Sequence, residues 1–157
     1  MKQLNEKVAI VTGAGQGIGQ GIALCLGKRG VKVVCVGRRP EPIEATAKEI
    51  RDLGGESFAM TCDTADRDRV KEVVAKTVET YKTVDVMINN AQSLPGSAPV
   101  EEVTYEMMYT AWSTGTLGSL NFMQECFPYM KEQGEGRVIN FASATGMFGY
   151  AGNLAYG

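Results

Sequence analysis

Histidine is absent from all 157 residues of this sequence. Catalytic devices of the Ser-His-Asp and Cys-His types are therefore excluded, and most metal sites lose their commonest ligand. The sequence also has no CxxC pair, since its four cysteines lie far apart, which argues against a zinc site or a redox motif. We expect no bound metal, and we interpret all four cysteines as buried thiols in a reducing, cytoplasmic setting: Cys25, Cys35, Cys62 and Cys126.

A strong charge and a long apolar run are missing as well. Lysine and arginine number 16 against 18 acidic residues, which leaves a net charge of -2. A charge this small does not attract nucleic acid or an anionic membrane surface. The first apolar run, residues 8–11, is too short for a signal-peptide core or a membrane span. We therefore expect a small-molecule ligand, no nucleic-acid or membrane partner, and a protein that remains in the cytoplasm.

The composition is that of an ordinary globular domain, with 44% hydrophobic and 22% charged residues. A chain of this length suits one domain, and no linker or repeat divides it. We therefore treat residues 1–157 as one domain.

Apolar runs alternate with amphipathic stretches along the whole chain. The pattern predicts strands over residues 7–12, 31–36, 57–61, 84–88 and 137–141. It predicts helices over residues 17–29, 42–53 and 105–130, with a further helix that Thr64 caps and that ends near Tyr81. On the first helix we expect Ile18, Ile22 and Leu26 to share the apolar face. Short strands joined by helices favour an α/β, doubly wound Rossmann-type parallel sheet with helices on both faces and strand order 3-2-1-4-5.

A glycine-rich segment, residues 12–19, lies where the first strand passes into the first helix. Glycines there let the backbone turn sharply and approach a pyrophosphate, whose charge meets free amides and the positive end of the helix dipole. The alternative interpretation is a flexible turn in a chain with 19 glycines. The flanking strand and helix favour a dinucleotide site, with these candidate residues: Gly13, Gly15, Gln16, Gly17, Ile18 and Gly19.

The TGxxxGIG spacing of this segment resembles the short-chain dehydrogenase/reductase family, and later segments keep matching in order. Asp63, with Thr64 beside it, follows the third strand where the family contacts adenine. Asn89-Asn90-Ala91-Gln92 resembles the family signature NNAG, with glutamine in place of glycine, and makes Asn90 and Ala91 cofactor candidates. Residues 136–143 resemble the fifth strand, which ends at a catalytic serine, here Ser143. Tyr156 follows 13 residues later, at the spacing of the catalytic tyrosine.

The end of the second strand indicates which dinucleotide is bound, because it reads Gly37-Arg38-Arg39 rather than ending in an acidic residue. An aspartate there would bind the ribose hydroxyls of NAD, whereas an arginine just beyond can hold the 2'-phosphate of NADP. The alternative is that Arg38 and Arg39 are solvated loop charges. We favour NADP(H), and NAD(H) stays open.

The resemblance implies an NAD(P)-dependent oxidoreductase that transfers hydride between the nicotinamide and an alcohol or ketone substrate. Tyr156 would exchange the proton on the substrate oxygen, and Ser143 would orient that oxygen. A tyrosine ordinarily has a pKa of about 10, which the family lowers with a lysine four residues later. Tyr150 is the rival tyrosine, interpreted as a pocket or surface aromatic. The resemblance also implies a homo-oligomer, a dimer or a tetramer.

The sequence departs from the family pattern in two places. Gly115 stands where the family has an asparagine that holds a water in its proton relay, and Ser113 or Thr114 are candidate substitutes. The sequence also stops at Gly157, before the expected lysine, so the resemblance covers an incomplete domain. We expect this length of chain to be nearly inactive, with an exposed fifth strand at Val138. The alternative function is a non-catalytic nucleotide-binding or structural fragment.

Overall fold

A parallel five-stranded sheet forms the centre of the computed structural model, which describes residues 4–157. Its strand order is β3-β2-β1-β4-β5, and every neighbouring pair is parallel. The fold class and the strand order predicted from the sequence are therefore confirmed. The strands are β1 (Val8–Thr12), β2 (Lys32–Gly37), β3 (Ser57–Thr61), β4 (Val86–Asn89) and β5 (Arg137–Asn140).

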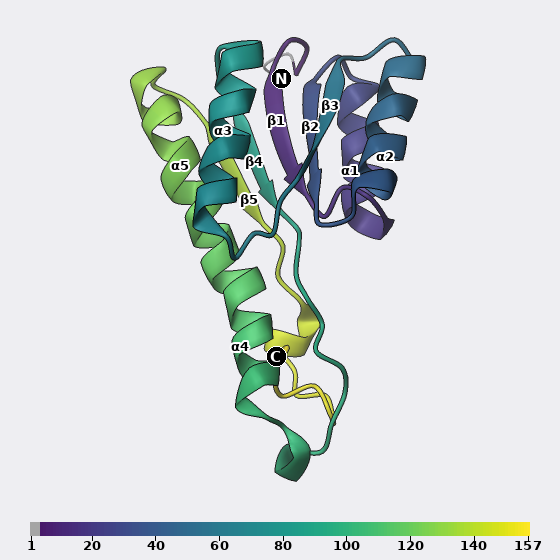
Figure 1. Cartoon of the computed structure of the whole chain (residues 1–157), viewed down its shortest axis with the longest axis vertical. Coiled ribbons are helices and arrows are strands. Elements are labelled where there is room, and N and C mark those ends of the chain that lie inside the picture. The colour runs from purple at the N-terminus through teal and green to yellow at the C-terminus, as the bar shows by residue number, and fades with distance from the viewer. Residues whose placement is uncertain (1–3) are drawn as a thin grey trace.

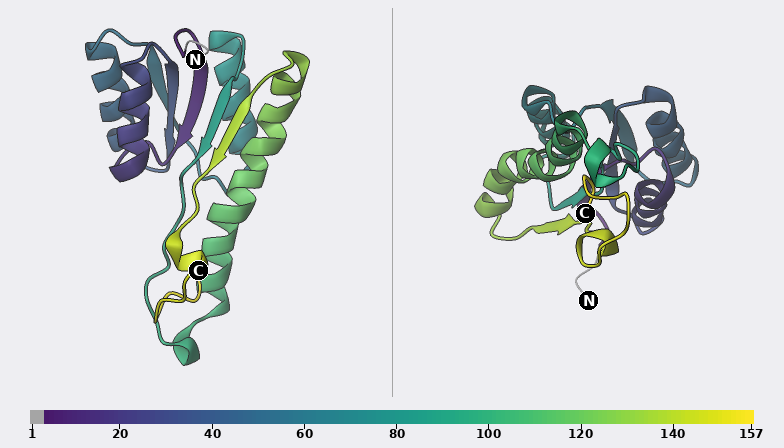
Figure 2. Two further views of the ribbon diagram at one scale, coloured as in Figure 1. Left: turned by 180° about the vertical axis from the view of Figure 1, so that it is seen from behind. Right: turned by 90° about the horizontal axis from the view of Figure 1, so that it is seen from below.

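Helices cover both faces of this sheet, as Figures 1 and 2 show. On one face, α1 (Gly17–Gly27) packs beside α2 (Pro40–Asp52), and on the other α3 (Arg67–Tyr81) packs beside α5 (Gly118–Glu132). Because both faces are covered, β1 is buried at every position, as its continuous apolar run predicts. Two cores result, one on each side of the sheet.

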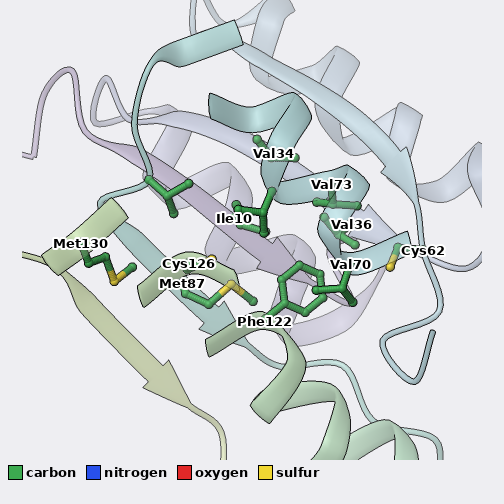
Figure 3. Close-up of a cluster of buried hydrophobic side chains, with 12 residues drawn as sticks. Ile10, Val34, Val36, Cys62, Val70, Val73, Met87, Phe122, Cys126 and Met130 are labelled. Carbon is green, nitrogen blue, oxygen red and sulfur yellow. The ribbon is translucent and has the colours of Figure 1, made fainter. Parts of the chain in front are cut away.

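The core under α3 and α5 is the one with the large side chains. Figure 3 shows Ile10 and Met87 from the sheet meeting Val70 and Val73 of α3 and Phe122 of α5. Phe122 is fully buried, so this single ring contributes on the order of 2–3 kcal/mol of hydrophobic stabilisation. Val70, Val73 and Val74 are the buried apolar positions of α3.

The predicted apolar face of α1 is confirmed at Ile22 and Leu26, which pack against the core, and is wrong at Ile18. Its buried positions are Gly19, Ala23 and Gly27, whereas Ile18 is 65% exposed. A Cβ added at Gly27 would lie 2.6 Å from the side chain of Ile50, so only a small residue lets α1 approach α2 this closely. Close packing therefore places the small residues at the centre of the contact, with Ile22 and Leu26 partly buried beside them.

The cap of α3 is also not the predicted one. Asp66 is the N-cap, and its carboxylate accepts hydrogen bonds from the backbone N–H groups of Asp68 and Arg69 at 3.1 Å each. Thr64 is buried two residues earlier, and its hydroxyl donates to the carbonyl of Thr114 at 3.0 Å. Both residue types cap helices well, and the chain places the aspartate where the free N–H groups are.

The predicted helix over residues 105–130 is present, but it is interrupted. It comprises α4 (Tyr105–Trp112), a π-helical turn η2 (Ser113–Leu117) and α5. In Figures 1 and 2, α4 extends past the carboxyl ends of the strands, and the last residues of the chain lie beside it. Two short 3-10 turns, η1 (Val100–Glu102) and η3 (Ala144–Gly146), belong to this extension.

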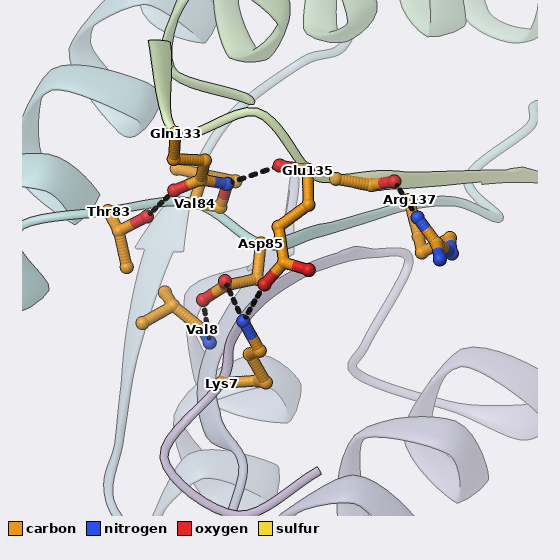
Figure 4. A network of polar contacts seen from close by, with 9 residues as sticks. Lys7, Val8, Thr83, Val84, Asp85, Gln133, Glu135 and Arg137 are labelled. Atoms are coloured by element: carbon orange, nitrogen blue, oxygen red, sulfur yellow. Dashed lines mark hydrogen bonds and ion pairs between the residues drawn. The ribbon is translucent and has the colours of Figure 1, made fainter. Parts of the chain in front are cut away.

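The opposite end of the sheet is held by a charged network, shown in Figure 4. Lys7 donates to Asp85 at 2.9 Å and to Glu135 at 2.7 Å, and the Asp85 carboxylate also accepts from the backbone N–H of Val8 at 2.9 Å. These hydrogen bonds raise the pKa of Lys7, that from Asp85 contributing most. The network joins the starts of β1, β4 and β5.

Three of the four cysteines are buried free thiols, as predicted: Cys35, Cys62 and Cys126. Loss of solvation raises the pKa of each of them to about 12. The prediction is wrong for Cys25, which is exposed. Cys25 lies away from the small-residue face of α1 and has Arg29, one turn later, at its sulfur and carbonyl.

Candidate cofactor and active site

A cavity of about 740 Å³ lies at the carboxyl ends of the strands. Parallel α/β sheets bind ligands at this edge, where the strand order reverses on either side of the first strand. The cavity brings together all but one of the predicted cofactor residues: Gly13, Gly15, Gln16, Gly17, Ile18, Arg38, Arg39, Asp63, Thr64, Asn90 and Ala91. Gly19 is buried behind them, against the carbonyl of Gly13.

The glycine loop forms the floor of this cavity. Gly13 and Gly17 have backbone φ angles of +68° and +56°, which residues other than glycine rarely adopt. A Cβ added at Gly13 would also lie 2.7 Å from the side-chain nitrogen of Asn90. Gln16 precedes α1 without a side-chain cap bond, and the first turn holds no acidic residue. The N–H groups at this helix end are therefore available to an anion such as a pyrophosphate.

Thr12 and Asn90 hold the glycine loop against the loop that follows β4. The Thr12 hydroxyl accepts from the backbone N–H groups of Asn90 and Ala91, and the Asn90 side chain donates to the Thr12 carbonyl, each at 3.0 Å. Sequence reasoning did not name Thr12 as a site residue. The sequence did contain a feature that could have identified Thr12: it is a polar residue at the end of an apolar strand, directly before the glycine loop.

Two arginines lie at the end of β2, and their surroundings differ. Arg39 donates to the side-chain oxygen of Gln16 across the cavity. Arg38 lines the cavity, is exposed, and has no hydrogen-bond or ion-pair partner within residues 4–157. Arg38 is therefore the guanidinium available to a phosphate at this end of the cavity.

Asp63 and Thr64 form the wall after β3. The Asp63 carboxylate accepts from the backbone N–H of Ala65 at 3.0 Å, which fixes the turn. The Thr64 hydroxyl is committed to the Thr114 carbonyl. A Cβ added at Gly118 would lie 2.6 Å from that hydroxyl, so this glycine lets α5 pack against Thr64.

The two predicted catalytic residues are placed differently. Tyr156 lines the cavity with the glycine loop and Asn90. Ser143 caps η3: its oxygen lies 3.0 Å from the Thr145 hydroxyl and accepts from the Thr145 N–H at 3.2 Å. Tyr150 is 57% exposed and does not line the cavity. The structure thus joins Tyr156 to the predicted cofactor residues, whereas Ser143 is not among the residues that line the cavity.

The loop after β4 adds residues that sequence reasoning had not assigned to the site. Gln92, Ser93 and Leu94 line the cavity. Thr114 of the π-helical turn, a candidate substitute for the family asparagine, lines it as well, whereas Ser113 does not. Ser93 N–H donates to the Thr114 hydroxyl at 3.0 Å, which attaches the loop to the helix. The sequence feature that could have identified this loop as part of the site is Gln92, because a long polar residue replaces the glycine of the NNAG pattern there.

No group of metal-ligating side chains forms a candidate metal site within residues 4–157. Over the same range, none of the helices is both long enough and apolar enough to cross a membrane.

Comparison with known proteins agrees with this geometry. The sequence profile of the short chain dehydrogenase family matches residues 7–157. A 12alpha-hydroxysteroid dehydrogenase of Clostridium sp. is 36% identical over 157 residues, which cover 96% of this chain and 60% of the relative. A putative ketoacyl reductase of Streptomyces coelicolor is 36% identical over 95% of this chain and 58% of the relative.

Solved structures give the same result. An NAD+-bound xylitol dehydrogenase superposes with a TM-score of 0.95 and 29% identity, covering 99% of this chain and 60% of its own. A short chain dehydrogenase from Mycobacterium avium superposes with a TM-score of 0.91 and 27% identity. The match covers 98% of this chain and 58% of the Mycobacterium protein. The chain thus spans about three fifths of the length of the proteins that it matches. With a family profile matched over residues 7–157 and a cavity lined by the glycine loop at the carboxyl ends of the strands, the chain belongs to the short-chain dehydrogenase family.

Proposed function

We propose that the protein containing this chain is an NADP(H)-dependent oxidoreductase that interconverts an alcohol and a ketone. One observation carries the proposal: a single cavity is lined by Arg38, by the glycine loop and by Tyr156. A group that binds phosphate, a backbone that approaches a pyrophosphate and a group that exchanges a proton thus share one space.

The residues present fit a nicotinamide dinucleotide. The uncapped start of α1 and the glycines with positive φ suit the pyrophosphate, and Asp63 suits the adenine end. Arg38, which has no partner within residues 4–157, suits a 2'-phosphate. When bound, the nicotinamide supplies or accepts the hydride.

The chain's own part in the chemistry is to bind, to orient and to exchange a proton. We assign the proton on the substrate oxygen to the Tyr156 hydroxyl. Ser143 is assigned the orientation of that oxygen, with its own hydroxyl held by Thr145. Asn90 and Thr12 keep the glycine loop in place while the ligand binds.

NAD(H) is the second candidate cofactor, because the similar xylitol dehydrogenase was solved with NAD+ bound. The two cofactors differ by the 2'-phosphate, so the environment of Arg38 separates them. The names of the two relatives above are a hydroxysteroid dehydrogenase and a ketoacyl reductase, which supports a secondary alcohol or ketone as the substrate class.

The proposed setting is the reducing cytoplasm, which three buried free thiols suit. The proposed assembly is a homo-oligomer, a dimer or a tetramer. Exposed aromatic side chains along α4 support it, since Tyr105, Tyr109 and Trp112 are between 50% and 95% exposed.

The full-length protein tests the proposal. Titration with NADPH and NADH should give tighter binding of NADPH, and NADPH oxidation with a panel of ketones should give turnover. Tyr156→Phe should keep NADPH affinity within about twofold and lower turnover at least about a hundredfold, the usual contribution of a general acid. Equal affinity for the two dinucleotides would overturn the cofactor choice. Dinucleotide binding without turnover by the wild type would favour the non-catalytic alternative.

A further inference from the structure

The wall between the β4 loop and the π-helical turn holds a polar side chain that the proposed chemistry has not used. Gln92 lines the cavity, and its side chain lies over Gly115 in the middle of η2. A Cβ added at Gly115 would lie 3.0 Å from Cδ, 3.1 Å from Nε2 and 3.3 Å from Oε1 of Gln92. The Gln92 carboxamide therefore occupies the space that a side chain at position 115 would take.

This carboxamide is available for a ligand. Within residues 4–157 no hydrogen bond holds the Gln92 side chain. A carboxamide that donates through nitrogen and accepts through oxygen can bind a water, a hydroxyl or a carbonyl group. Its neighbours in the wall are already engaged: Ser113 donates to the Thr110 carbonyl at 3.4 Å, and Thr114 donates to the same carbonyl at 2.7 Å.

The backbone that carries Gln92 is held by a chain of hydrogen bonds. Ser93 N–H donates to the Thr114 hydroxyl, and the Thr114 carbonyl accepts from the Thr64 hydroxyl, each at 3.0 Å. The Thr64 carbonyl accepts from the buried Asn121 side chain at 3.0 Å. These hydrogen bonds attach the loop after β4 to η2 and α5, so Gln92 and Gly115 keep their positions relative to each other. π-helical turns of this kind recur at functional sites.

We propose that Gln92 and Gly115 act as one unit, in which Gly115 leaves room for the Gln92 carboxamide and Gln92 positions the proton transfer at Tyr156. The inference rests on the proposed function. The family that the sequence resembles has an asparagine, and thus a carboxamide, where this chain has Gly115. In this structure the Gln92 side chain brings a carboxamide to the same space from the loop after β4. The glutamine at position 92 and the glycine at position 115, neither of which matches the family pattern, therefore compensate each other.

The inference makes Gln92 a positioning residue, which acts through Tyr156, rather than a residue that gives the substrate its affinity. Gln92→Leu in the full-length protein should lower kcat by about tenfold to a hundredfold, the cost of misplacing a reacting group by about 1 Å. KM for the ketone and the Kd for NADPH should stay within about twofold. The solvent deuterium isotope effect on kcat should increase, because proton transfer then limits the rate. Gln124→Leu, at an exposed glutamine of α5 outside the cavity, is the matched control and should change none of these values.

Gly115→Ala tests the other half of the unit without removing the amide. Its Cβ would lie 3.0 Å from the nearest Gln92 atom, so the carboxamide should shift slightly, and kcat should fall by less than it does in Gln92→Leu. The displacement has a readout that needs no catalysis: the side-chain NH2 resonance of Gln92, identified by its loss in Gln92→Leu, should shift in the NMR spectrum of Gly115→Ala. An unchanged resonance would overturn the contact.

A double variant that exchanges the positions of the carboxamide and the glycine, called the exchanged pair, is the most decisive test. Gln92→Gly combined with Gly115→Asn moves the carboxamide back to the helix, and kcat should return to within about threefold of the wild type. Two results would overturn the inference: a kcat that Gln92→Leu leaves unchanged, whatever happens to KM, or a kcat of the exchanged pair that is no higher than that of Gln92→Leu. Wild type that lacks turnover with every ketone would instead count against the proposed function, since the comparison requires an active wild type.

Discussion

At the residue scale, the phosphate end of the cavity depends on one side chain. Arg38 is free within residues 4–157, whereas Arg39 is held by Gln16. We predict that Arg38→Ala in the full-length protein weakens NADPH binding by about 1.5–3 kcal/mol, the usual range for hydrogen bonds to charged groups, and leaves NADH binding unchanged. Calorimetric titration of both dinucleotides measures the difference.

Lys48→Ala is the matched control for this prediction. It removes one positive charge from α2, but Lys48 pairs with Asp52 and does not line the cavity. It should affect NADPH binding little. Equal losses for NADPH and NADH in Arg38→Ala would show that Arg38 does not bind the phosphate.

The buried thiols make the stability depend on pH. Burial raises the pKa of Cys35 to about 12, against an ordinary value of 9.0. Between these values the unfolded chain releases a proton that the folded chain keeps, so stability is full below pH 9 and falls as the pH rises toward 12. From pH 8 to pH 10 one such thiol contributes a loss of about 1.4 kcal/mol.

We therefore predict that Cys35→Ala lowers the stability at pH 8 but makes the decline between pH 8 and pH 10 shallower than in the wild type. Urea unfolding at a series of pH values measures this. Cys25→Ala, which removes a thiol that is exposed in the folded protein, should reproduce the wild-type decline. A Cys35→Ala curve parallel to the wild type would contradict the assignment.

At the element scale, capping and packing decide where helices begin and which face they bury. We predict that Asp66→Ala destabilises the protein by about 0.5–2 kcal/mol, because the N–H groups of Asp68 and Arg69 lose their acceptor. Asp66→Asn keeps an acceptor oxygen and should lose only a fraction of that. Denaturant unfolding at pH 7 compares the two variants, and equal losses would show that charge rather than capping is responsible.

The long helix illustrates the limit of pattern analysis at this scale. Its extent follows from apolar spacing, and the structure has helix from Tyr105 to Glu132. The π-helical turn at Ser113–Leu117 does not follow from it, because a single extra residue in one turn barely changes the periodicity. Its position depends on Thr64, Ser93 and Gln92, which reach it from elsewhere in the chain.

At the scale of the whole molecule, β5 is the last strand of the sheet. Val138, Ile139 and Phe141 are 40–46% exposed there, and the outer edge of β5 has no neighbouring strand within residues 4–157. Such edges pair with other chains. We predict that the isolated 157-residue chain associates as its concentration rises, and that Ile139→Lys suppresses the association, because a charged edge resists pairing.

Light scattering coupled to size-exclusion chromatography measures the mass across a concentration series. Lys131→Ala, at an exposed position of α5 rather than of the edge strand, is the control and should associate like the wild type. A wild-type chain that stays monomeric at the highest concentrations would contradict the prediction.

From the sequence by itself, local patterns predicted the strands, the helices and the glycine loop, and the alternation of strands with helices predicted the sheet order. The resemblance to the family predicted the rest of the cavity lining. Buried strands read as apolar runs, and a cofactor loop requires glycines at a strand-to-helix junction. Only the tertiary structure decided that α1 buries glycine and alanine, that Asp66 rather than Thr64 caps α3, and that Gln92 fills the space over Gly115. Each of these depends on a neighbour far away in the chain, whose distance and volume determine which of several locally acceptable residues makes the contact.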